Sequence, residues 1–136
     1  MLGAAQLIAL TIAYESANQG NIGMESVASV IWNRAQSHSA LEMAMLCVHP
    51  KQFSCWNGHA PSMADINYWH NSGQPNLFAY KRALEIAISM IYGTFKPVLD
   101  ATHYARYDCK KAWMDNLQVM CRIGDHVFMK QREEKA

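Results

Sequence analysis

Residues 4–17 read AAQLIALTIAYESA, and this stretch decides the fold because almost every side chain before Glu15 is apolar. Its larger side chains recur at helical spacing, which predicts a buried amphipathic helix. The apolar run falls short of the roughly 20 residues that a bilayer-spanning helix needs, so we expect no membrane insertion. No Lys or Arg precedes Arg34, whereas a signal peptide begins with basic residues. We therefore expect a protein that carries no export signal of its own.

The composition indicates one folded domain. The chain has 136 residues, of which 51% are hydrophobic and 17% are charged. The charged share lies below the usual ~25%, which excludes disorder for most of the chain. Twelve Lys and Arg oppose eleven Asp and Glu without a basic block, so we do not expect a nucleic-acid partner. We expect a monomer with a single domain over residues 1–136 and a polar tail from about Gln131.

Further helical patterns follow the first one, and the last third of the chain changes to β-type sequence. We predict the other helices at residues 24–36, 40–47, 63–70 and 77–92. Ser62 with Asp65 forms a capping-box pattern, residues 71–75 have turn chemistry, Asn76 can cap the last helix, and Gly93 ends it. Residues 101–107 and 125–129 are rich in β-branched and aromatic side chains, which predicts two paired strands with a loop or short helix around 113–117. The fold class is thus α+β, mostly α, with a small β-hairpin near the C-terminus.

Glu15 is the first acidic residue of the chain and directly follows the apolar run. Burial and the negative end of the helix dipole both disfavour its charged form. Such a carboxyl suits a general acid at neutral pH. The alternative is an ordinary glutamate at a helix end that points to solvent.

Two other segments have side chains suited to a polyhydroxylated ligand. The loop around residues 51–57 combines amide, hydroxyl and aromatic groups, namely Gln52, Phe53, Ser54, Trp56 and Asn57. Thr102 and Tyr104 share one face of a predicted strand, and Phe128 lies on the strand expected opposite. Aromatic faces could pack on sugar rings while amides bind acetamido groups. The alternative in both places is that the aromatic side chains fill the core.

The cysteines and histidines show no metal-binding spacing, so we expect neither a metal nor a cofactor. The four cysteines are interpreted as reduced thiols, with a Cys109–Cys121 disulfide as the alternative. A nucleophilic pair of Cys55 and His126 lacks any supporting signature. No nucleotide-binding motif is present.

Five segments of the chain stand out by their order and spacing. They are YESA at residues 14–17, GMESVASVIWNR at 23–34, PKQFSCW at 50–56, ATHY at 101–104 and IGDHVF at 123–128. Taken together, they resemble the SleB-like cell wall hydrolases, the family of spore-cortex-lytic enzymes and related phage lysins, and the resemblance spans residues 7–130. The intact QFSCW string is the most specific of the five segments.

The resemblance implies a lysozyme-like helical domain that cuts the glycan strand of peptidoglycan. Glu15 matches the family's catalytic acid, the first Glu of a Gly-Glu-Ala-Arg-Gly-Glu motif. The second Glu of that motif is Gln19 here, and the family's Gly-Asn-His is Gly124-Asp125-His126. If a second carboxylate takes part, the candidates are Asp125 first, then Asp65, Asp100 and Asp108.

Three activities stay open at this stage. A site with one carboxylate favours a lytic transglycosylase that cuts between N-acetylmuramic acid (MurNAc) and N-acetylglucosamine (GlcNAc). A hydrolytic muramidase would need the second carboxylate, and a non-catalytic glycan-binding module would need neither. Since neither a signal peptide nor a wall-binding module is evident, we expect a phage endolysin. Such a protein stays in the host cytoplasm until lysis and reaches the wall through a holin pore.

Overall fold

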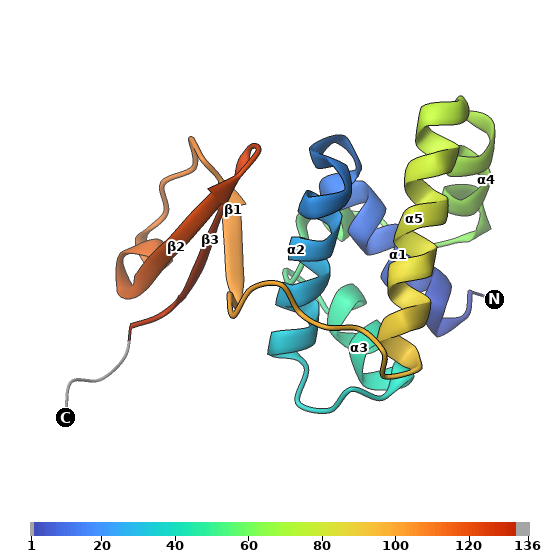
Figure 1. The fold of residues 1–136 in the computed structure, drawn as a ribbon. Coiled ribbons are helices and arrows are strands. Elements are labelled where there is room, and N and C mark those ends of the chain that lie inside the picture. Colours follow the sequence, from blue (N-terminus) through green and yellow to red (C-terminus); the bar gives the residue numbers. More distant parts are fainter. Residues whose placement is uncertain (1, 133–136) are drawn as a thin grey trace.

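The computed structural model describes residues 2–132. Five helices form one side of the molecule and a three-stranded sheet forms the other, next to α2 (Figure 1). The helices are α1 (Ala4–Ser16), α2 (Gly20–Arg34), α3 (Ala40–Val48), α4 (Met63–Asn71) and α5 (Gln74–Ile91). The strands are β1 (His103–Arg106), β2 (Leu117–Ile123) and β3 (His126–Gln131). Short 3-10 helices lie at Ala17–Gln19, Ser54–Trp56 and Ala112–Asn116. The mostly helical α+β fold class is thus confirmed.

Helix α1 is the centre of the helical part, because α2, α3, α4 and α5 all contact it. Every side chain from Ile8 to Ala13 is buried, and Ser16 is buried one turn later. A helix that is apolar on all sides is a core helix. The expected amphipathic helix is therefore buried all round, without a broad solvent-facing side.

Two helices begin earlier than the sequence indicated. Helix α2 starts at Gly20 because one 3-10 turn joins it to α1, and Gly20 takes a φ of 76° at this junction. Helix α5 starts at Gln74, since Pro75 fits a first helical turn in which its missing N–H costs nothing. The turn predicted over residues 71–75 is confirmed only at Ser72 and Gly73, where Gly73 has a φ of 112°, and the Asn76 cap was wrong because Asn76 lies inside α5. The capping box of Ser62 and Asp65 is confirmed.

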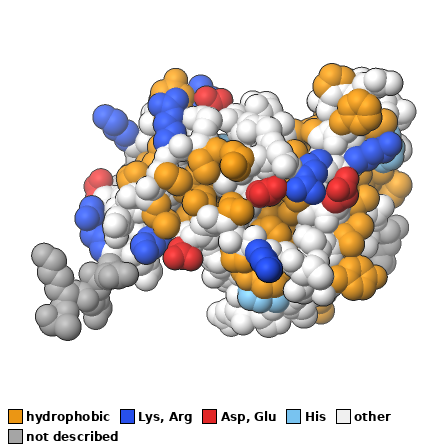
Figure 2. All heavy atoms as spheres, in the orientation of Figure 1, with side chains coloured by type: hydrophobic (Ala, Val, Ile, Leu, Met, Phe, Trp, Pro, Cys, Tyr) orange, Lys and Arg blue, Asp and Glu red, His pale blue; other side chains and the backbone are white. Residues whose placement is uncertain are grey.

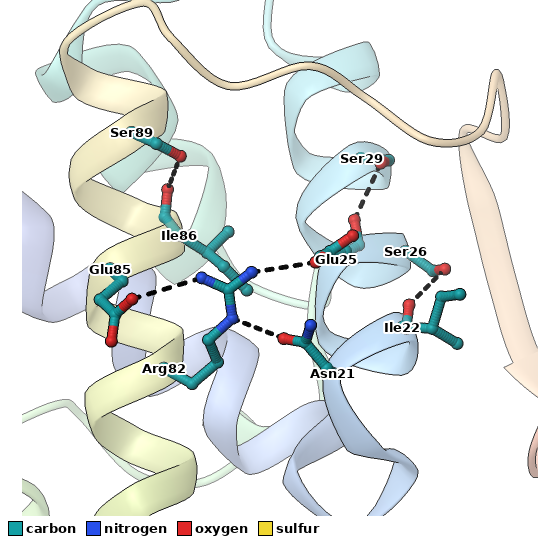
Figure 3. A network of polar contacts seen from close by, with 9 residues as sticks. All are labelled: Asn21, Ile22, Glu25, Ser26, Ser29, Arg82, Glu85, Ile86 and Ser89. Atoms are coloured by element: carbon teal, nitrogen blue, oxygen red, sulfur yellow. Dashed lines mark hydrogen bonds and ion pairs between the residues drawn. The ribbon is translucent and has the colours of Figure 1, made fainter.

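A polar network on the surface joins α2 to α5 (Figure 3). The Arg82 guanidinium of α5 donates to Glu25 Oε1 at 2.9 Å and to Asn21 Oδ1 at 2.5 Å, both on α2. It also lies 3.5 Å from Glu85 Oε2 on its own helix. Figure 2 shows basic and acidic side chains interspersed over the face of the molecule that it draws.

The sheet has the order β1-β3-β2 and is antiparallel throughout. The predicted pairing of the two strand segments is confirmed, with Tyr104 opposite Phe128. Strand β2 was not predicted, because its buried and exposed side chains follow one another without the alternation that marks a half-buried strand. Gly124 and Asp125 form the turn from β2 to β3, and the segment expected as a loop or short helix near 113–117 is a 3-10 helix at Ala112–Asn116. Residues 133–136, most of the predicted polar tail, lie outside the described residues.

Side chains of α2 and the sheet join the two parts. Asn33 Nδ2 donates to the carbonyl oxygens of Leu99 and Ala101 at 2.7 and 2.9 Å, just before β1. Phe128 of β3 is completely buried in the same core as α1. No helix among residues 2–132 is long and apolar enough to span a bilayer.

We predict that Leu10→Ala, at a fully buried position of α1, lowers the free energy of unfolding by about 2–5 kcal/mol. The lost apolar contacts and the cavity left behind both contribute. Denaturant unfolding measures the change, with Ile22→Ala as the control. Ile22 is 61% exposed, so its truncation should change the stability by less than about 0.5 kcal/mol. Equal losses in the two variants would contradict the central place of α1.

Candidate active site

A cleft of about 1850 Å³ runs between the loop after α3 and the sheet. Its floor includes Glu15, at the C-terminal end of α1. Residues 48–52 and 56–61 line one wall, and residues 103–106 of β1 line the other. Glu15 is the only Asp or Glu among the described residues that line this cleft.

Three donors from two distant segments bind the Glu15 carboxylate. Its Oε2 accepts from the backbone N–H of Cys55 at 3.1 Å and from the Ser54 hydroxyl at 3.2 Å. Its Oε1 accepts from the Tyr104 hydroxyl. The carboxylate therefore has a fixed orientation towards the cleft, held from the loop on one side and from β1 on the other.

Tyr104 stays protonated in this arrangement. Burial raises its pKa well above the ordinary value, and the nearby charge of Glu15 raises it further. The ring is supported from behind by Phe128 and Phe53, whose ring centroids lie 5.7 and 6.4 Å away. Tyr104 can thus serve Glu15 as a hydrogen-bond donor over the whole physiological pH range.

The structure brings several of the predicted site residues together. Gln52, Ser54, Trp56 and Tyr104 line the cleft with Glu15. Trp56 exposes 8% of its surface, and its indole N–H donates to Thr11 Oγ1 of α1 at 2.9 Å. Most of this side chain is therefore core, with one edge in the cleft.

Three other predicted substrate-binding residues do not line the cleft. Phe53 and Phe128 expose 2% and 0% of their surface, so their rings pack behind Tyr104 where no sugar can reach them. Thr102 lies just before β1, and its hydroxyl is 2.9 Å from Nδ1 of the adjacent His103. Both Phe side chains fill the core, which was the alternative to sugar binding that the sequence left open for these two segments.

Asp125, the first candidate for a second carboxylate, is also absent from the cleft lining. It forms a two-way contact with Gln19: Gln19 Nε2 donates to Asp125 Oδ2 at 3.0 Å, and the Asp125 N–H donates to Gln19 Oε1 at 2.8 Å. Gly124 makes room for this contact, because a Cβ there would lie 2.0 Å from Gln19 Oε1. This pair, here called the Gln19–Asp125 clasp, links the turn after α1 to the β2–β3 turn.

Asp65 is likewise engaged elsewhere. It is 5% exposed and accepts hydrogen bonds from Tyr14 Oη at 2.7 Å and from the Ser62 N–H at 2.8 Å, with His59 Nε2 at 2.9 Å. Burial pushes the pKa of Asp65 up, but these hydrogen bonds outweigh it and lower the pKa. Neither Asp100 nor Asp108 lines the cleft.

Sequence reasoning missed three cleft residues. Arg34, at the end of α2, is half-buried, with its guanidinium 5.4 Å from the Phe53 ring centroid. Trp113 is 43% exposed, and His126 lies 4.9 Å from Tyr104 between ring centroids. Burial lowers the pKa of His126, so it is neutral at pH 7. Arg34 and His126 gave a sequence signal, because they lie in the segments at 23–34 and 123–128 that carry the family resemblance, whereas Trp113 gave none.

The four cysteines form no disulfide, and Cys55 is not a nucleophile. All four are free thiols, so the Cys109–Cys121 alternative is not formed. Burial and the charge of Glu15 raise the pKa of Cys55, which keeps its thiol protonated and unreactive. Within residues 2–132 no three His, Cys, Asp or Glu side chains are grouped to hold a metal ion.

Comparisons with known proteins agree on one family. The family model described as Cell Wall Hydrolase matches residues 18–129, which include the cleft loop and all but the last two residues of the sheet and begin three residues after Glu15. The catalytic domain of the Bacillus cereus SleB protein is 26% identical, with a TM-score of 0.61, over 93% of this chain and 89% of that one. The catalytic domain of the germination-specific lytic transglycosylase SleB from Bacillus anthracis is 24% identical, with a TM-score of 0.61 over 93% of both chains. No curated protein sequence matches significantly.

We predict that Gln19→Glu destabilises the fold, because it sets a second carboxylate against Asp125 in place of an amide donor. Adding Asp125→Asn should restore stability, since the pair again has one carboxylate and one amide. The coupling energy from the double-mutant cycle is expected to be about 1–2 kcal/mol. Thermal unfolding of the four proteins measures it. Additive effects of the two substitutions would show that the clasp contributes nothing.

Proposed function

The chain belongs to the cell wall hydrolase family, and from that premise we propose that it cleaves the MurNAc–GlcNAc bond of peptidoglycan as a lytic transglycosylase. Glu15 is the proposed general acid and base. The observation that carries the proposal is that Glu15 is the single carboxylate among residues 2–132 that lines the cleft, held by three donors from two segments. A transglycosylase needs one such group, whereas hydrolysis by two carboxylates needs a partner on the other side of the sugar ring.

The hydrogen bonds indicate which oxygen of Glu15 carries the transferable proton. Oε2 faces the backbone N–H of Cys55, which can only donate, so this oxygen stays an acceptor. Oε1 faces the Tyr104 hydroxyl, which can donate or accept. A proton on Oε1 thus requires only that this hydroxyl turn. Tyr104 and Cys55 are positioning residues in this scheme.

The proposed reaction consumes no water. Glu15 Oε1 gives its proton to the glycosidic oxygen, and the bond from that oxygen to C1 of the muramoyl ring breaks through an oxocarbenium-like state. The C6 hydroxyl oxygen of the same sugar then bonds to C1. Its proton passes to the Glu15 carboxylate, which restores the acid and leaves a 1,6-anhydro end.

Substrate contacts are proposed for the exposed polar and aromatic groups of the cleft. Gln52 and Ser54 supply amide and hydroxyl groups on the loop side. Trp113, 43% exposed on the sheet side, offers a flat apolar face to a sugar ring. Trp56 contributes one edge.

An endolysin role also stands as a proposal. It would place the protein in the host cytoplasm until lysis and require a holin for access to the wall. The fold and family fit this role equally with other wall-remodelling roles, so lysis of host cells from within, with and without a co-expressed holin, is the measurement that distinguishes them.

We predict that Glu15→Gln lowers the cleavage rate at least about a hundredfold, because the amide has no proton of suitable acidity to give. Mass analysis of muropeptides from purified peptidoglycan should show anhydro-muropeptides with the unsubstituted protein and almost none with the variant. Glu42→Gln is the matched control, since Glu42 is exposed on α3 outside the cleft. Full activity of Glu15→Gln would refute the assignment.

Asp125→Asn separates the transglycosylase from a hydrolytic muramidase. The asparagine oxygen can still accept from Gln19, so the clasp survives while the charge is lost. For a transglycosylase we expect activity within about twofold of the unsubstituted protein and anhydro products throughout. Hydrated, reducing products that disappear with Asp125→Asn would instead identify a muramidase with Asp125 as its second carboxylate.

A further inference from the structure

The charges around the cleft differ from those of the whole chain. Among the described residues, four basic side chains line it against the single carboxylate of Glu15, namely Arg34, Lys51, Arg106 and Lys111. Over the whole sequence the basic and acidic residues nearly balance, at twelve to eleven. An excess of one sign on the walls of a cleft raises the local concentration of ligands of opposite sign.

Three of these four cations have no ion-pair partner within residues 2–132. Arg106 pairs with Asp108 at 2.9 Å and lies 4.0 Å from Asp125, so its charge is largely compensated. No ion pair is present for Arg34, Lys51 or Lys111. Their charges are therefore available to a ligand.

Arg34 is the deepest of the three. It is half-buried, and its guanidinium lies against the Phe53 ring behind the loop wall. Burial lowers the pKa of Arg34, so an unpaired charge at this position costs free energy. Binding an anion in the cleft would offset that cost.

Lys51 stands on the loop wall in an unusual backbone conformation. Its φ of 65° makes it the only non-glycine residue with a positive φ among residues 2–132. A long side chain in this region of φ/ψ space carries a backbone cost, and such costs gather at functional sites. Lys111 stands beyond the end of β1, on the sheet side of the cleft.

We propose that the cleft selects glycan strands whose stem peptides carry free carboxylates, and that Arg34, Lys51 and Lys111 bind those carboxylates. The inference rests on the proposed function. Stem peptides branch sideways from the muramic residues, so a strand that lies over Glu15 directs them to the two walls. The two lysines would meet the outer carboxylates, and Arg34 would meet a carboxylate close to the glycan.

The test compares three forms of one peptidoglycan preparation from a wall without teichoic acids. The first is native, the second has its free carboxylates converted to neutral amides by carbodiimide coupling with ammonia, and the third has its stem peptides removed by an amidase. We expect the native form to be cleaved about tenfold faster than the amidated form at low salt, the size of a few weak ion pairs. The preference should shrink as salt screens the charges.

Variants then locate the preference. Lys51→Asn combined with Lys111→Asn should bring the ratio of native to amidated rates towards one, and Asn tolerates the backbone conformation at position 51. Lys81→Asn combined with Lys96→Asn, which removes the same two charges from exposed sites outside the cleft, should keep the ratio. The effect of Arg34→Gln is measured by the same ratio of the cleavage rates on native and amidated strands, because any partial loss of folded protein lowers both rates equally.

Each outcome decides one of the two proposals. Equal rates on native and amidated strands would overturn the carboxylate preference and leave the proposed function intact. Stripped strands cleaved as fast as native ones would show that the lactyl carboxylate suffices and would also overturn it. Failure to cleave any of the three forms would overturn the proposed function itself.

Discussion

The hydrogen bonds to Glu15 are the contacts on which the site and the attachment of the sheet both depend. The carboxylate lies at the C-terminal end of the buried helix α1, and the donors at Ser54, Cys55 and Tyr104 bind it there. Because the donors come from the loop after α3 and from β1, satisfying one carboxylate fixes both walls of the cleft.

This arrangement also explains the aromatic side chains around the cleft. Phe53 and Phe128 are too buried to meet a ligand, yet both pack against Tyr104. They restrict the ring of the tyrosine, whose hydroxyl donates to Glu15. The two Phe side chains thus help to place a Glu15 contact without touching a ligand.

Much of the fold was predictable because it depends on local patterns. The apolar run of α1, the Ser62–Asp65 cap and the β1–β3 pairing all have short-range sequence signals. Strand β2 was missed because its buried and exposed side chains do not alternate, and its place is set by pairing with β3. The site was predictable only in part. Glu15 could be identified because it directly follows the apolar run, but whether an aromatic residue faces the cleft or the core depends on tertiary packing. Trp113 gave no signal at all, since a lone tryptophan in an irregular segment looks the same in either role.

The Gln19–Asp125 clasp suggests why the sequence departs from the family pattern at two positions together. The resemblance puts a glutamate where Gln19 stands and an asparagine where Asp125 stands. Since these two side chains bind each other here, both patterns contain one carboxylate and one amide across the same contact. When the carboxylate and the amide change places between positions 19 and 125, an acceptor still faces a donor. The negative charge, however, moves from the turn after α1 to the turn between β2 and β3. The charge then lies 4.0 Å from the Arg106 guanidinium, which a carboxylate at position 125 can pair with and an asparagine cannot. A contact that tolerates this exchange is better explained by its role in holding the sheet against α1 than by a role for either side chain in proton transfer.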